Sequence, residues 1–111
     1  MAGTNIAKAH LGAGKPSIGT WIRLNGVLST EMMARVGFDW VVLDARHSNL
    51  DMHRFQFVLL ANSTVNIVPM VRVPWNHPIE LKRTLGAGSY GVVIPVVKSR
   101  GDAVNAVRAV R

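Results

Sequence analysis

The sequence predicts an α/β fold built from four βα units. Four short apolar runs rich in Val and Ile alternate with segments of helical spacing along the 111 residues. Most of these runs lack polar alternation, which is typical of parallel strands covered on both faces. Their starts fall roughly 23 to 27 residues apart, a spacing that suits a strand followed by a helical crossover.

The four apolar runs are the predicted strands, and the segments between them are the predicted helices. The strands are expected at residues 17–24, 40–44, 66–72 and 91–96. The helices are expected at residues 30–36, 51–61, 78–85 and 102–110, with a further helix at about 4–11. Asp51 suits an N-cap, Pro78 suits the first position of a helix, and Gly86 and Gly88 mark a helix end. Met32 and Met33 are expected to fill the core.

Four βα units admit two architectures. One is a small open parallel sheet of flavodoxin type, and the other is the first half of a (βα)₈ TIM barrel. Both place their chemistry at the carboxyl ends of the strands. Those ends here are residues 24–25, 44–47, 72–75 and 95–98.

Composition indicates a globular chain, because 49% of the residues are hydrophobic. We expect residues 1–111 to form one partial-barrel domain. No apolar run approaches the roughly 18 residues that a membrane helix needs, and residues 1–13 do not resemble a signal peptide. The chain has no cysteine, which excludes disulfides and thiolate metal sites. The cytoplasm is the expected location.

The formal net charge of +7 raises the question of a nucleic-acid partner. The thirteen Lys and Arg residues are scattered, and Lys82–Arg83 is the only adjacent basic pair. No basic run and no interleaving of Arg with aromatic residues occurs. The pattern therefore does not favour binding to nucleic acid.

The first candidate site follows the second predicted strand. Asp44 closes an apolar run, and His47 comes three positions later, where an imidazole at the strand end would serve as a base. The alternative is that Asp44 caps a loop and His47 is an ordinary surface residue. Residue types alone leave both interpretations open.

Arg72 is the second candidate, because an arginine at the end of a buried strand is costly unless an anion meets it. Its planar guanidinium suits a carboxylate or phosphate ligand. An internal ion pair with Asp44 is the alternative, and the two interpretations are compatible.

The segment 12–17 does not have the order of a phosphate loop, and His47, His53 and His77 lack zinc-ligand spacing.

Five stretches together resemble the HpcH/HpaI aldolase family. The resemblance runs in order from about residue 15 to the last residue and is specific. The matching stretches are 18–21 (IGTW), 37–44 (GFDWVVLD) followed by His47, 69–74 (PMVRVP), 81–88 with 91–95 (GVVIP), and 107–111.

This resemblance implies a TIM barrel that works as an oligomer, with Mg²⁺ or Mn²⁺, on 4-hydroxy-2-oxo acids that it cleaves to pyruvate and an aldehyde. By the same resemblance, His47 is the general base for the hydroxyl proton. Arg72 holds the carboxylate or keto oxygen of pyruvate and stabilises enolate charge. Asp44 lies near the water shell of the metal, and Trp21 lines the pocket.

The sequence departs from the family pattern at three points. Arg46 stands where the family usually has Glu, and Gly86 where it often has Asp. The metal-binding Glu and Asp of the family come from later strands, so no metal ligand is assigned in this chain. We expect the chain alone to be a weak or inactive catalyst. Two alternatives are a non-catalytic assembly partner of an intact paralogue and an anion-binding open α/β domain.

Overall fold

The structure is a computed structural model that describes residues 5–23, 27–47, 55–56, 59–60 and 65–111. Of the helix predicted at 51–61, residues 55–56 and 59–60 are helical and the rest lies outside the described residues. The predicted strand end at 24–25 also lies outside them.

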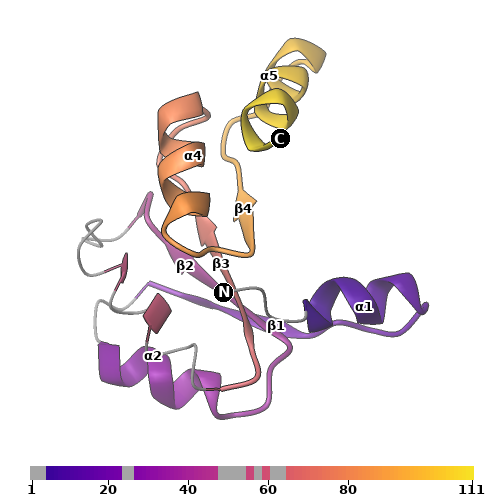
Figure 1. Ribbon diagram of the computed structural model, residues 1–111, viewed down its shortest axis with the longest axis vertical. Coiled ribbons are helices and arrows are strands. Elements are labelled where there is room, and N and C mark those ends of the chain that lie inside the picture. Colours follow the sequence, from indigo (N-terminus) through magenta and orange to yellow (C-terminus); the bar gives the residue numbers. More distant parts are fainter. Residues whose placement is uncertain (1–4, 24–26, 48–54, 57–58, 61–64) are drawn as a thin grey trace.

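The central feature is a parallel four-stranded sheet (Figure 1). It is formed by β1 (Gly19–Ile22), β2 (Trp40–Asp44), β3 (Val68–Arg72) and β4 (Gly91–Val93). The strands lie in the order β1-β2-β3-β4, so each strand pairs with the next along the chain. A barrel has this sequential order, whereas a flavodoxin-type sheet reverses its order at a switch point. The predicted α/β fold of four βα units is confirmed, in its half-barrel version.

Local capping explains where three of the helices begin. These three are α1 (Ile6–Gly12), α4 (Pro78–Gly86) and α5 (Arg100–Val110). The remaining helix, α2, spans Val27–Ala34. The side chains of Asn5, His77 and Ser99 accept hydrogen bonds from backbone N–H groups in the first turns of α1, α4 and α5. Gly88 ends the turn after α4 with a φ of 113°, which only glycine adopts at little cost. The helices predicted at 4–11, 30–36, 78–85 and 102–110 therefore form, with ends that differ from the prediction by at most three residues.

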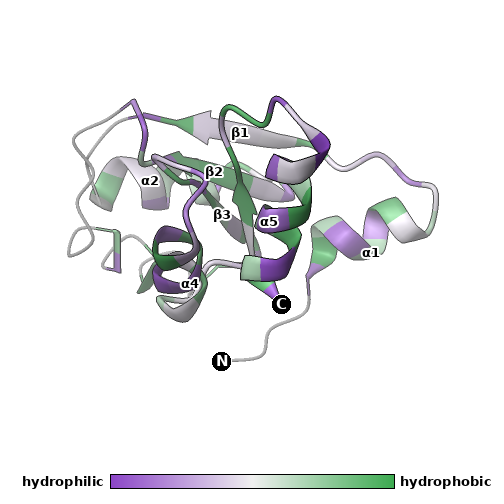
Figure 2. Cartoon of the chain, turned by 90° about the horizontal axis from the view of Figure 1, so that it is seen from above, coloured by the Kyte–Doolittle hydropathy of each residue, from purple (hydrophilic) through white to green (hydrophobic). Residues whose placement is uncertain are grey.

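The core lies around β2 and β3, whose residues are the most buried of the sheet. Figure 2 shows the hydrophobic colouring of residues along these strands, whereas α4 and α5 carry both hydrophobic and hydrophilic residues. At one point the packing requires glycine, because a methyl group at Gly19 would overlap the indole of Trp40. The buried apolar cluster comprises Ile22, Ala34, Val41, Leu43, Phe55, Leu59, Ile67, Val71, Val73, Leu81 and Ala109.

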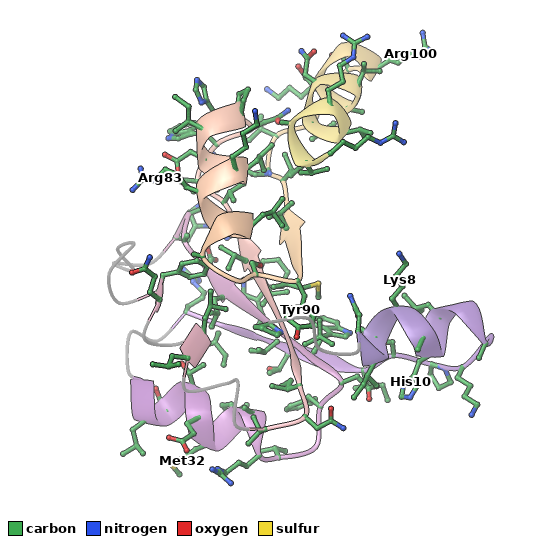
Figure 3. The ribbon with its side chains drawn as sticks, in the orientation of Figure 1. Lys8, His10, Met32, Arg83, Tyr90 and Arg100 are labelled. Carbon is green, nitrogen blue, oxygen red and sulfur yellow. The ribbon has the colours of Figure 1, made fainter. Side chains whose placement is uncertain are left out.

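The face of α2 differs from the prediction. Met32 is 62% exposed and points away from the sheet (Figure 3), so its predicted role in the core is wrong. Met33 does pack against the core. The helix begins at Val27 rather than Thr30, and it buries Thr30 and Ala34 instead. Because Thr30 and Ala34 are small, spacing of large apolar residues did not reveal this face.

The fourth strand is shorter than predicted. It ends at Val93 and not at residue 96, and residues 94–98 form no further strand. Val96 has a φ of 57°, a left-handed conformation that is unfavourable for a β-branched residue and incompatible with a strand. In the described part of the chain, no helix has the length and apolar character needed to cross a membrane. The cytoplasmic location remains a prediction.

Candidate active site

Strand register brings the predicted site residues together. Asp44 and Arg72 are opposite partners at the carboxyl ends of β2 and β3. Ile22 pairs with Leu43, so Arg23, which follows β1, reaches the same end of the sheet. We call this edge the rim: Arg23, Asp44, Arg46, His47 and Arg72, together with Trp21, Pro74 and Trp75, which contact them.

Asp44 is the hub of the rim and is almost completely buried, with 1% of its surface exposed. Arg72 binds it through two nitrogens, with Nη2 at 2.5 Å from Oδ2 and Nε at 3.2 Å from Oδ1. The backbone N–H groups of Arg46 and His47 each donate to Oδ1 at 2.9 Å. The indole Nε1–H of Trp21 donates to Oδ2 at 3.2 Å. A buried carboxylate is tolerated here because both of its oxygens accept several hydrogen bonds.

These contacts change the acidity of Asp44. Burial by itself raises the pKa of the carboxyl. The hydrogen bonds from Arg72, the His47 backbone, Trp21 and the Arg46 backbone lower it by more, so the pKa of Asp44 lies well below its ordinary value. The side chain is therefore an anion under all ordinary conditions and holds Arg72 in a fixed position.

The low pKa of Asp44 makes the folded state sensitive to acid. The unfolded carboxyl takes up a proton near its usual pKa of about 4, while the folded carboxyl does not. The contribution of the ionised Asp44 carboxylate to the free energy of unfolding is therefore complete above about pH 5. It is lost as the pH falls below 4, at up to about 1.4 kcal/mol per pH unit.

Urea unfolding of the wild type and of Asp44→Asn at pH 7, 5, 4 and 3 measures this effect. The difference between their free energies of unfolding is expected to be constant from pH 7 to 5 and to shrink below pH 4. A difference that stays constant down to pH 3 would contradict the assignment.

His47 meets Arg72 at the rim, since its Nδ1 lies 2.6 Å from Arg72 Nη2. A guanidinium only donates hydrogen bonds, so Nδ1 accepts and the neutral ring carries its hydrogen on Nε2. The residue itself is exposed. His47 and Arg72, the candidates that the sequence places at two neighbouring strand ends, are therefore in direct contact.

Trp21 supports the ion pair in two ways. Besides its hydrogen bond to Asp44, its ring lies under the guanidinium of Arg72, with 5.1 Å between the guanidinium carbon and the ring centroid. Trp21 is 43% exposed, so part of its side chain remains accessible beside Arg72. The predicted pocket residue thus contacts both charged partners.

Two arginines and a second tryptophan were not predicted as members of this cluster. Arg23 places Nη2 3.2 Å from the carbonyl oxygen of His47 and Nε 4.0 Å from Asp44 Oδ2. Arg46 donates from Nη1 to the carbonyl of Pro74 at 2.5 Å, and its guanidinium carbon lies 4.9 Å from the ring centroid of Trp75. Arg23 directly follows its strand, as Arg72 closes its own, and this common position was the signal in the sequence.

The rim does not suit the divalent cation that the family resemblance implies. Within the described residues, no three His, Cys, Asp or Glu side chains are grouped as a metal site requires. Asp44 is the only carboxylate of the rim, and its oxygens already accept hydrogen bonds. Two arginine side chains, Arg72 and Arg23, also lie within 4.0 Å of that carboxylate. Ligands for Mg²⁺ or Mn²⁺ would have to come from outside the described residues.

Comparisons with known proteins show which family this chain is similar to. The family model described as HpcH/HpaI aldolase/citrate lyase matches residues 17–111. A 4-hydroxy-2-oxo-heptane-1,7-dioate aldolase of Escherichia coli is 36% identical over 96% of this chain and 41% of its own length. A 5-keto-4-deoxy-D-glucarate aldolase of Escherichia fergusonii is 41% identical over 96% of the chain and 42% of its own.

Solved structures show the same relationship. An HpcH/HpaI aldolase/citrate lyase family protein from Burkholderia cenocepacia superposes with a TM-score of 0.90 and 32% identity, over 97% of this chain and 43% of that protein. The chain thus spans about two fifths of the length of the relatives that it matches. The family model covers most of the chain, so the chain belongs to the HpcH/HpaI aldolase/citrate lyase family.

Proposed function

We propose that this chain supplies the oxo-acid-binding half of an aldolase site that reversibly cleaves 4-hydroxy-2-oxo acids to pyruvate and an aldehyde. Arg72 holds the carboxylate or keto oxygen, His47 handles the hydroxyl proton, Asp44 fixes Arg72, and Trp21 lines the pocket. The contact between His47 and Arg72 at the carboxyl ends of the strands is the observation that carries the proposal.

The hydrogen bond between Arg72 and His47 sets a condition on the proton transfer. As placed, Nδ1 is occupied by Arg72 and Nε2 carries hydrogen, so the ring has no free basic nitrogen. A substrate carboxylate that attracts the Nη2 hydrogen of Arg72 would release the lone pair on Nδ1. In this proposal, binding of the oxo acid frees His47 Nδ1 to accept a proton, because both events involve the same Nη2–H group of Arg72.

A pyruvate titration monitored by the imidazole NMR signals of His47 tests the proposal. Pyruvate is expected to shift these signals in the wild type. The signals of His77, which caps α4 through its own Nδ1, serve as the internal control and should stay in place. If saturating pyruvate leaves the His47 signals unchanged, the proposed site is wrong.

The isolated chain is expected to be a weak or inactive catalyst, because the described rim has no ligand set for a cation that could polarise the keto group. The measurement is aldol cleavage of a 4-hydroxy-2-oxo acid in the presence of Mg²⁺ or Mn²⁺. An intact family member serves as the reference. Turnover within about tenfold of that reference, a barrier difference of about 1.4 kcal/mol, would refute the prediction.

A second candidate function is a non-catalytic partner of an intact family member. Arg46 favours it, because a guanidinium at the rim replaces the negative charge that the family resemblance predicts there and repels a cation. Co-expression with a full-length family barrel, followed by purification through a tag on this chain, tests the idea. Recovery of the 111-residue chain without the barrel at equimolar expression would rule it out.

We also propose that the chain self-associates. Leu28 and Met32 lie one turn apart on α2 and are 70% and 62% exposed. β1 and β4 are the outer strands of the described sheet, which leaves hydrogen-bonding groups at its edges.

Size-exclusion chromatography with light scattering is expected to show a dimer or larger species. Met32→Glu should shift it towards the monomer by placing a charge in the apolar patch. Ile79→Glu is the matched control, since Ile79 is equally exposed but lies on α4. A stable wild-type monomer would disprove the proposal.

A further inference from the structure

The turn that carries His47 is anchored to the end of β2 by its backbone donors. The N–H groups of Arg46 and His47 both donate to Asp44 Oδ1 at 2.9 Å, an arrangement typical of a side-chain-capped turn. Asp44 is itself buried and bound to Arg72. The carbonyl groups and side chains of the turn still need partners of their own, and these come from the neighbouring loops.

The side chain of Arg46 ties the turn to the loop after β3. Its Nη1 donates to the carbonyl oxygen of Pro74 at 2.5 Å, and its guanidinium carbon lies over the Trp75 ring, 4.9 Å from the centroid. A guanidinium can make both contacts because it is flat, so that one face lies on the ring while an N–H group in its plane reaches the carbonyl. Arg46 is half-buried, so these contacts belong to the packed edge of the sheet.

Arg23 ties the same turn to the segment after β1. Its Nη2 donates to the carbonyl oxygen of His47 at 3.2 Å. Since β2 lies between β1 and β3, the turn is held from both neighbouring strand ends by hydrogen bonds from guanidinium to carbonyl groups. The side chain of Arg23 is 66% exposed, so water competes for its bond more than for that of Arg46.

The position of this turn decides where the imidazole of His47 lies. The residue is exposed, and its Nδ1 meets Arg72 Nη2 at 2.6 Å. A single hydrogen bond of an exposed side chain adds little net stability, and fixing the ring costs conformational entropy. The contact with Arg72 therefore depends on a backbone that is already held in place, and Arg46 lies directly between the two anchored residues, Asp44 and His47.

We propose that Arg46 is a positioning residue, whose contacts with Pro74 and Trp75 keep His47 Nδ1 on Arg72 and so keep the hydrogen of the neutral ring on Nε2. The inference rests on the proposed oxo-acid function, in which His47 and Arg72 act together. Arg46 acts here through the shape of its guanidinium and not through its charge. The Glu that the family resemblance predicts at this position has no donor for a carbonyl oxygen, so it could not make this contact.

The nitrogen-15 NMR signals of the His47 imidazole, recorded at about pH 9 without pyruvate, test the proposal. The wild type is expected to show a single tautomer with its hydrogen on Nε2. Arg46→Lys keeps the charge but cannot lie flat on Trp75, so the ring should sample both tautomers and its two nitrogen signals should move towards each other. The signals of His10, which contacts Asp39 just before β2, are the internal reference and should stay in place.

Two changes at the ring test whether the stacking matters. Trp75→Ala should reproduce the effect of Arg46→Lys on the His47 signals, whereas Trp75→Phe keeps a ring face and should retain the wild-type signals. The double variant of Arg46→Lys and Trp75→Ala should change them no more than either single variant, because both break the same contact.

Arg35→Lys is the matched control, since it makes the same exchange at an exposed guanidinium on α2. It should leave the His47 signals unchanged, and urea unfolding checks that each variant is folded. The proposal is overturned if the wild type already shows a mixture of tautomers, if Arg46→Lys keeps the wild-type signals, or if Arg35→Lys moves them as much.

A pyruvate titration of the same samples separates this proposal from the oxo-acid function. If Arg46→Lys changes the tautomer signals but pyruvate leaves the wild-type His47 signals unchanged, Arg46 is a positioning residue and the aldolase proposal fails. If pyruvate shifts the His47 signals while Arg46→Lys keeps the wild-type tautomer, the aldolase proposal stands and the role of Arg46 is refuted.

Discussion

Asp44→Asn is expected to lower the free energy of unfolding by about 3 kcal/mol at pH 7. The substitution keeps the shape of the side chain but removes the charge. It also places an amide N–H₂ group among donors from Arg72, Trp21 and two backbone amides. Loss of one member of a buried pair leaves the other charge without compensation, so the cost greatly exceeds that of a surface pair.

Urea unfolding followed by circular dichroism measures this difference. Glu31→Gln is the matched control, because it removes one partner of the surface pair with Arg35 on α2. That change should cost no more than about 0.5 kcal/mol. A loss below about 1 kcal/mol for Asp44→Asn would mean that the hub contributes little to the fold.

Arg72→Gln is expected to weaken pyruvate binding about 100-fold, which corresponds to about 2.7 kcal/mol. The variant loses the positive charge, the two parallel N–H donors of the guanidinium and the hydrogen bond to His47 Nδ1 together. Pyruvate affinity, measured by NMR titration, reports the effect. Wild-type affinity in Arg72→Gln would remove Arg72 from the binding site.

Arg72→Gln also lowers the free energy of unfolding, because Asp44 loses its main ion-pair partner. Arg72→Lys keeps a positive charge beside Asp44 and should remain folded. It should still weaken pyruvate about tenfold, since lysine lacks the bidentate geometry. Arg108→Gln, which removes one positive charge from the exposed last turn of α5, controls for the change in net charge and should bind pyruvate as the wild type does.

The order of elements followed directly from local patterns. The strand at 40–44 and the helix beginning at Pro78 were predicted with their observed starts, because an apolar run and a proline are signals carried by a few adjacent residues. The end of β4 was predicted three residues too far. Its apolar run continues to Val97, but the backbone at Val96 leaves the extended region, and composition does not report that.

The rim was predicted in part. Asp44, His47 and Arg72 were found because each stands at or just after the end of an apolar run, where parallel strands bring side chains to one edge. Arg23 and the contact between Arg46 and Trp75 were not found. They depend on how two loops approach each other, and loop conformation is set by contacts between distant residues.

The sequence by itself determined the four βα units, the family and the edge at which chemistry is expected. It did so because strand length, helix starts and the run GFDWVVLD are properties of neighbouring residues. Only the tertiary structure decided the strand order, the exposed side of α2, and the positions of Arg23 beside Asp44 and of Arg46 against Trp75. Those features arise from strand pairing and from side-chain contacts between residues that are far apart along the chain, which local patterns do not report.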